Sequence, residues 1–175
     1  MQVVSMSSPK LTTRNLVYLA MLMAMSLVLG RFSVGNDWIK VSPSFIAVGI
    51  MGYYFGPWLA ALAGALNDQI AYFFWGSGGN FLGFTLSAAV GAMIYGLFFH
   101  KQVVSIWRVF VATALVIGVV NIGLDTLWLV MMGFKFNVII WPRVIKNLVV
   151  LPIQGALMYT ILKAVVRVRP HLNGQ

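Results

Sequence analysis

Charged residues are scarce in this chain. Only 9% of its 175 residues are Asp, Glu, Lys or Arg, whereas hydrophobic residues make up 61%. A soluble domain carries roughly 25% charged residues, so this chain has too few to cover a surface that faces water. A transmembrane helix needs about 20 apolar residues, and the chain length therefore fits about six short spans with small loops. It leaves no room for a separate soluble domain such as an ATPase.

Cysteine is absent, and acidic residues nearly so. Without cysteine the chain forms no disulfide, no thiolate nucleophile and no Cys-ligated metal site. Its three acids, all Asp, stand against 12 Lys and Arg, for a formal net charge of +9. Three scattered acids argue against the clustered acid or metal motif of a membrane enzyme. No basic stretch lies on a soluble element, as nucleic-acid binding would require. We therefore expect no cofactor, no metal and no nucleic-acid partner.

Long hydrophobic runs alternate with short polar or glycine-rich segments. The pattern predicts an all-α integral membrane protein, a compact bundle of six transmembrane helices forming a single domain over residues 1–175. Pro43 suits the first turn of the second helix, and Gly56-Pro57 marks a turn between the second and the third. The expected spans are residues 15–31, 43–55, 58–75, 81–99, 109–132 and 141–166.

Basic residues flank the expected spans on both sides of the bilayer. Seven fall on the side of the termini and five on the other, which favours cytoplasmic termini under the positive-inside rule. That rule discourages so many on the outer side, where the only acid is Asp37. A basic outer mouth is what an anionic ligand needs. The five outer residues are Arg31, Lys40, Lys135, Arg143 and Lys146.

Two acids lie inside expected spans, where an ionisable group is a functional hypothesis by default. Asn121 and Asp125 are four residues apart and share a helix face, with Trp128 one turn further on. A carboxylate beside an amide and an indole suits a flat heterocycle, because the carboxylate accepts two N–H bonds and the ring stacks. Alternatively, Asp125 pairs with a basic residue and holds two helices together. For Asp68, ligand contact and helix bracing both remain open.

The last expected span carries a polar stripe. Arg143, Lys146 and Asn147 are spaced i, i+3 and i+4, so they face one way. Arg143 and Lys146 can clamp ligand carboxylates, or both can snorkel to lipid headgroups. Arg31, at the end of the first span, either guards the ligand's entrance or snorkels.

Aromatic and small residues supply the remaining candidates. Tyr72, Trp75 and Phe81 flank the glycine-rich segment 76–80, either as an interfacial belt or as a stacking wall beside a mobile lid. Ala20 and Ala24 let another helix approach the first span closely, within the bundle or from a partner protein.

The order and spacing of four segments resemble a known family. They are LTTRNLVYLAMLMAMSLVLGRF, FGPWLAALAGALNDQIAYF, GFTLSAAVGAMIYGLF and PRVIKNLVVLPIQ. Together they are similar to the folate-specific S components, the substrate-binding subunits of energy-coupling factor (ECF) vitamin transporters. The resemblance covers nearly the whole chain.

The resemblance implies six helices, cytoplasmic termini, a folate pocket on the outer side and a lid between the first two spans. It implies that Ala20 and Ala24 contact a transmembrane coupling subunit, that two cytoplasmic ATPases drive the complex, and that the S component topples in the cell membrane without hydrolysing ATP. The alternatives are an S component for another vitamin such as riboflavin or thiamine, a small membrane enzyme, and a structural subunit or small channel.

Overall fold

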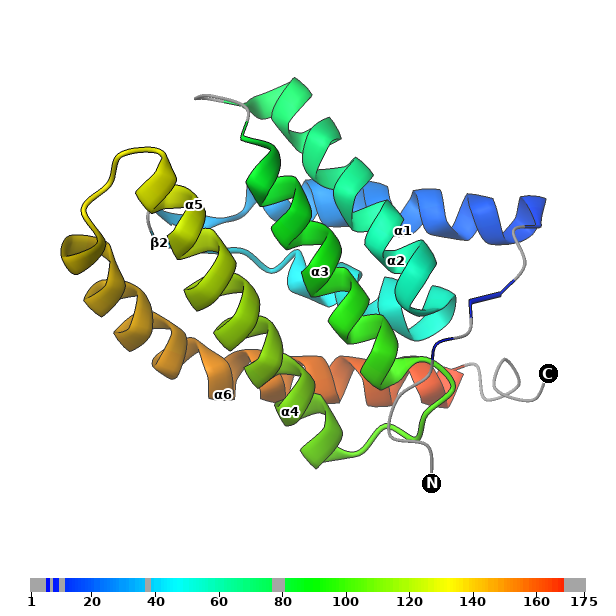
Figure 1. Ribbon diagram of the computed structural model, residues 1–175. Helices are drawn as coiled ribbons and strands as arrows, with labels where there is room; N and C mark the ends of the chain where they lie inside the picture. The colour runs from blue at the N-terminus through cyan, green and yellow to red at the C-terminus, as the bar shows by residue number, and fades with distance from the viewer. Residues whose placement is uncertain (1–5, 7, 10–11, 37–38, 77–80, 169–175) are drawn as a thin grey trace.

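The computed structural model describes residues 6, 8–9, 12–36, 39–76 and 81–168. Helices dominate this part of the chain, and five helical stretches are long and apolar enough to cross a membrane. The protein is therefore an all-helical, multi-pass membrane protein. Its helical elements (Figure 1) are α1 (Thr13–Arg31), α2 (Phe45–Trp75), α3 (Leu82–Phe99), α4 (Ile106–Leu115), the π-helix η1 (Val116–Leu124), α5 (Asp125–Met131) and α6 (Phe136–Val168).

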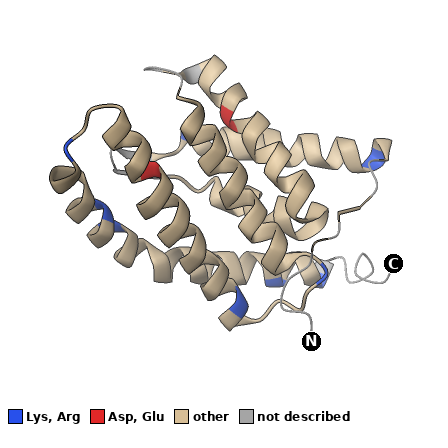
Figure 2. Cartoon of the chain, in the orientation of Figure 1, with Lys and Arg blue, Asp and Glu red and all other residues tan. Residues whose placement is uncertain are grey.

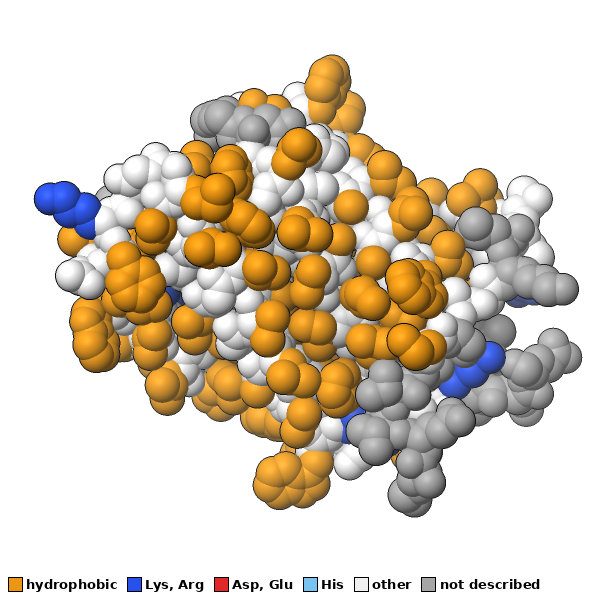
Figure 3. All heavy atoms as spheres, viewed as in Figure 1, with side chains coloured by type: hydrophobic (Ala, Val, Ile, Leu, Met, Phe, Trp, Pro, Cys, Tyr) orange, Lys and Arg blue, Asp and Glu red, His pale blue; other side chains and the backbone are white. Residues whose placement is uncertain are grey.

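The surface matches a lipid environment. Hydrophobic side chains cover most of the face seen in Figure 3, and the Lys and Arg side chains on it lie towards its edges. Figure 2 shows the same separation along the helices, whose basic residues lie mainly near their ends. The first residues of α1 and the last residues of α6 lie on the same side of the bundle (Figure 1). The basic residues therefore lie mainly at the edges of an apolar surface.

Helix α2 contains both the second and the third expected spans, 43–55 and 58–75. Its backbone is non-helical at Gly56, where φ is 74° and ψ is −177°, a conformation open mainly to glycine. Pro57 follows, and the ribbon turns back on itself there (Figure 1). The expected turn at Gly56-Pro57 is thus present, inside a single helical element.

Backbone packs directly against backbone where α2 crosses α3. A Cβ on Gly96 would lie 2.5 Å from the Pro57 Cα, and one on Gly52 would lie 2.7 Å from the Gly96 nitrogen. Neither position has room for a side chain. Beside this crossing, the Tyr95 and Phe99 rings stack with centroids 5.3 Å apart in the core. The crossing therefore fixes α2 and α3 to each other.

A short antiparallel hairpin joins α1 to α2. Strands β1 (Val34–Asn36) and β2 (Ile39–Val41) pair with Val34 opposite Val41. The sequence predicted only a polar connecting segment here, because strands of three residues give too short an alternation to detect.

The fifth expected span, 109–132, contains a change of helix type. The chain runs without a break from α4 through η1 into α5, covering Ile106–Met131. In the nine residues of η1 the backbone hydrogen bonds span five residues instead of four, which widens the turn. Such segments are rare and are frequent at functional sites.

His100 closes the break in α2 from the end of α3. Pro57 has no N–H to offer the Tyr53 carbonyl four residues earlier, so that buried oxygen needs another donor. The His100 Nδ1 lies 3.0 Å from it, and His100 is only 4% exposed. We infer that Nδ1 carries the proton and donates. The imidazole Nε2 has no hydrogen-bond partner in the described part of the chain.

The buried His100 should therefore make the protein less stable as the pH is lowered. Burial lowers the pKa of His100 and outweighs the hydrogen bond to Tyr53, which acts in the opposite direction, while nearby Lys101 lowers it further. The unfolded chain takes up a proton at pH about 6.5, before the folded chain does, so the free energy of unfolding drops as pH falls below that value. The expected result is a lower melting temperature of the detergent-solubilised protein at pH about 5.5 than at about 7.5.

His100→Asn is the matched variant, because its amide keeps a donor near the Nδ1 position and does not titrate. Its melting temperature should fall less over the same pH interval. An equal fall in both proteins would show that His100 is not the responsible group.

Candidate substrate-binding cavity

A cavity of about 840 Å³ opens between α1, α2, α3, η1, α5 and α6. Sites for small molecules typically measure about 300–1,000 Å³, so this one holds a drug-sized ligand. Most of the residues expected at the site from the sequence line it. They are Arg31, Asp68, Tyr72, Phe81, Asn121, Asp125, Lys146 and Asn147.

Asp68 both lines the cavity and braces two helices. The Thr85 hydroxyl of α3 donates to its Oδ2 at 2.8 Å, and Gln69 donates to the same hydroxyl oxygen. The two possibilities raised by the sequence are therefore compatible. Thr85 holds one carboxylate oxygen from α3 while the residue borders the ligand space.

Asp125 lies beside two polar side chains from α3 and α5. The Trp128 indole donates to the Ser87 hydroxyl at 3.1 Å. Ser87 also stabilises the Asp125 carboxylate. An indole N–H can only donate, so the Ser87 proton remains available to the acid. Asp125 thus presents an acceptor at the cavity wall. Figure 2 shows the two described acids on α2 and α5, on elements that face the same cavity.

Two buried amide oxygens lack hydrogen-bond partners within the described residues. They belong to Asn147, which is 2% exposed, and to Asn67, whose amide nitrogen donates to Ser26 at 2.9 Å. Both residues line the cavity. An unsatisfied buried acceptor costs about 1–3 kcal/mol, so these oxygens call for donors that the described part of the chain does not supply.

Arg143 does not line the cavity. Its Nη1 donates to the Asn121 carbonyl and to the Thr126 hydroxyl, each at 3.0 Å. Lys146, one turn further along α6, does line it, as does the exposed Arg31 at the end of α1. Among the described side chains, the cations that border the ligand space are therefore Lys146 and Arg31. The stripe predicted on α6 thus divides between two roles.

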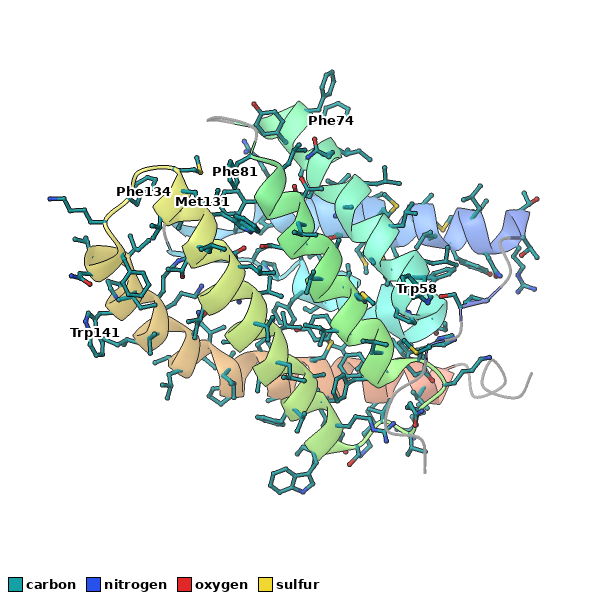
Figure 4. All side chains as sticks on the ribbon, viewed as in Figure 1. Trp58, Phe74, Phe81, Met131, Phe134 and Trp141 are labelled. Atoms are coloured by element: carbon teal, nitrogen blue, oxygen red, sulfur yellow. The ribbon has the colours of Figure 1, made fainter. Side chains whose placement is uncertain are left out.

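Aromatic rings form one end of the cavity. Phe81, which lies where α3 begins (Figure 4), packs against Trp128 with ring centroids 5.7 Å apart and against Phe84 at 6.1 Å. Trp128 stands behind Phe81 and does not line the cavity. The Trp75 side chain lies outside the described residues.

Ala20 and Ala24 lie apart from this cavity, exposed on α1. Large apolar side chains flank them on the same exposed surface, including Val17, Met21 and Val28. Only 11% of the apolar window of α1 is buried inside the bundle, the lowest share of the five candidate spans. The close packing that these alanines permit is therefore not used by the described elements of the bundle.

Sequence reasoning missed several polar residues of the cavity. Ser87 is an isolated serine in an apolar span, where a small polar residue more often serves helix packing. Gln154 donates to the Tyr95 hydroxyl at 3.3 Å, and both line the cavity. Gln154 is the exception, because its position seven residues after Asn147 already placed it on the inward-facing polar stripe of the last span.

Residues 14–162 match the protein family described as "ECF transporter, substrate-specific component". The chain belongs to this family, which confirms the resemblance seen in the sequence. It is thus a transporter subunit of the cell membrane and not an enzyme.

Individual relatives share one name. The chain is 42% identical to the folate transporter FolT of Leuconostoc mesenteroides subsp. mesenteroides over 161 residues, which cover 88% of this chain and 87% of that one. It is 36% identical to FolT of Clostridium novyi over 154 residues, covering 87% and 90%. A crystal structure of FolT bound with folic acid superposes with a TM-score of 0.81 at 35% identity, covering 85% of this chain and 92% of that one.

Asn147→Leu should stabilise the ligand-free protein. The substitution removes a buried oxygen without a partner at similar side-chain volume, and we expect the melting temperature in detergent to rise by a few degrees. Gln154→Leu is the control on the same helix, because its amide has a partner in Tyr95 and its loss should lower the melting temperature. Equal destabilisation by both would show that the Asn147 oxygen is already satisfied in the free protein.

Proposed function

We propose that this chain captures folate at the outer face of the cell membrane and delivers it inward as the substrate-binding subunit of an ECF transporter. The observation that carries the proposal is the pairing of fixed acceptors with aromatic and cationic groups around one cavity of about 840 Å³. The FolT relatives support the same ligand.

The acceptors match the pterin end of folate. A pterin is a flat ring with an amino group and a ring N–H side by side, and a carboxylate accepts two such donors in parallel. Asp125, Asp68 and the amide oxygens of Asn67 and Asn147 border the cavity, and Phe81 offers a ring face for stacking. Asp125 is the residue to which we assign the pterin donors.

The cations match the other end of the ligand. Folate ends in a glutamate with two carboxylates, and Lys146 and Arg31 border the cavity beside these acceptors. A basic mouth also disfavours a cationic vitamin such as thiamine. Riboflavin is flat but carries no carboxylate, so it makes no use of the cations. Trp75 completes the aromatic end in this proposal.

For the topology, we propose six spans with both termini in the cytoplasm. The Gly56 break divides α2 into two membrane-crossing halves, and the ends of α1 and α6 share one side with Arg14, Arg108, Lys163 and Arg167. The hairpin β1–β2, between the first two spans, then lies outside beside Ser33, Ser42 and Ser44 of the cavity wall, where it acts as the lid.

The partners in this proposal are a transmembrane coupling subunit and two cytoplasmic ATPases. Helix α1 is the least buried span, and its exposed Ala20 and Ala24 leave a shallow surface onto which another helix packs closely. The chain itself hydrolyses no ATP, and it releases folate inward by reorienting in the membrane.

Isothermal titration of the purified protein in detergent tests the ligand. Folate should bind in the nanomolar range, and riboflavin and thiamine should not. Asp125→Ala should weaken folate binding at least tenfold, because a charged acceptor for two pterin donors is lost. If the well-folded protein binds another vitamin and not folate, that vitamin is its ligand. If it binds no vitamin, the proposed function is wrong.

A bulky residue on α1 tests the docking surface. Ala24→Trp should leave folate binding intact and reduce uptake into cells that supply the coupling subunit and ATPases by at least tenfold, because the indole prevents close helix contact. Ala156→Trp, at an exposed alanine of α6, is the control and should transport normally. Uptake by Ala24→Trp at the wild-type rate would remove this face of α1 from the interface.

A further inference from the structure

The wall of the cavity that carries Asn121 and Asp125 is built on an uncommon backbone. Asn121 lies in the π-helix η1 (Val116–Leu124), and Asp125 is the first residue of α5, where α-helical bonding resumes. The wider π turn is less favourable than an α turn, and it persists where surrounding contacts hold it. The direction of the Asp125 side chain depends on where this transition occurs.

Arg143 reaches the transition from another helix. Its Nη1 donates both to the Asn121 backbone carbonyl, inside η1, and to the Thr126 hydroxyl, in α5, at 3.0 Å each. Thr126 is buried. The two acceptors lie on either side of Asp125 in the sequence, so one guanidinium nitrogen ties the backbone before the acid to the side chain after it.

The positive charge of Arg143 also acts on Asp125. It attracts the Asp125 carboxylate electrostatically, as Lys146 also does. Charged donors form the stronger hydrogen bonds, and a planar guanidinium holds two acceptors in fixed directions, which a lysine ammonium does not. Since Arg143 does not line the cavity, these contacts direct it at the wall and not at the ligand.

We infer that Arg143 is a positioning residue for substrate binding: it locks the π-to-α transition of η1 and α5 and thereby aims Asn121 and Asp125 into the cavity. This inference rests on the proposed folate function and deepens it. It also replaces the role suggested by the sequence, in which Arg143 clamps the ligand's carboxylates itself.

A pair of ligands separates the two roles. Pteroate shares the pterin and benzoyl parts of folate but lacks the glutamate. If Arg143 positions Asp125, Arg143→Gln weakens the binding of folate and of pteroate by the same factor, about tenfold or more. Arg143→Lys then restores part of the lost affinity for both ligands. Arg143→Gln that weakens folate alone would show that the guanidinium holds the glutamate and would overturn the inference.

The loss of folate affinity caused by Arg143→Gln should also depend on Asp125. In an Asp125→Asn background, Arg143→Gln should weaken folate binding several-fold less than it does in the wild type, because the group it aims has already been changed. Equal losses in both backgrounds would contradict positioning. Lys163→Gln removes one charge from the same helix, far along it from Arg143 and outside the cavity lining, and should leave both affinities unchanged.

Amide hydrogen exchange gives a readout that needs no ligand. Exchange over residues 116–126 should be faster in Arg143→Gln than in the wild type and unchanged in Lys163→Gln. Unaltered exchange in Arg143→Gln would overturn the inference. A wild-type protein that binds neither folate nor pteroate would instead sink the proposed function, while the exchange result would still report on the π segment.

Discussion

Hydrocarbon offers no hydrogen bonds, so every backbone carbonyl that lacks a helical partner in this bundle needs a donor from elsewhere in the protein. Two departures from regular helix illustrate the constraint. At Gly56-Pro57 the Tyr53 carbonyl receives the His100 imidazole, and in η1 the Asn121 carbonyl receives the Arg143 guanidinium. In both cases a side chain from outside the helix donates to the irregular backbone. The irregular backbone is thereby tied to its neighbours.

The same constraint applies to the buried polar side chains that have no hydrogen-bond partner. Thr85 donates to one oxygen of Asp68, and Ser26 accepts from the amide nitrogen of Asn67. The Asn147 and Asn67 oxygens have no such partner within the described residues, although both border the cavity. A bundle selected only for stability would replace them with apolar residues. In the proposed complex the ligand supplies these donors.

Composition and periodicity were sufficient to place the helices, and most of the site residues predicted from them line the cavity, because a polar residue in an apolar span must face inward. The spacing of Asn121 and Asp125 put that pair on the cavity wall, and Lys146 and Asn147 of the polar stripe on the last span line it as well. The hairpin and η1 could not be predicted, since three-residue strands and a one-residue change in hydrogen-bond span leave no periodic signature. Arg143 shares a helix face with Lys146, yet its long side chain reaches the neighbouring element instead of the cavity. Spacing gives the face of a helix and not the end point of a flexible side chain.

The contact between Gly52, Gly96 and Pro57 has a mechanical consequence. Where two helices touch through their backbones, no side chain can change rotamer to let one slide past the other, and separating them opens a void in lipid. Helices α2 and α3 therefore form one stiff frame on which Asp68, Phe81 and Ser87 keep a constant spacing. Any widening of the cavity to admit or discharge a ligand therefore requires movement of elements outside that frame.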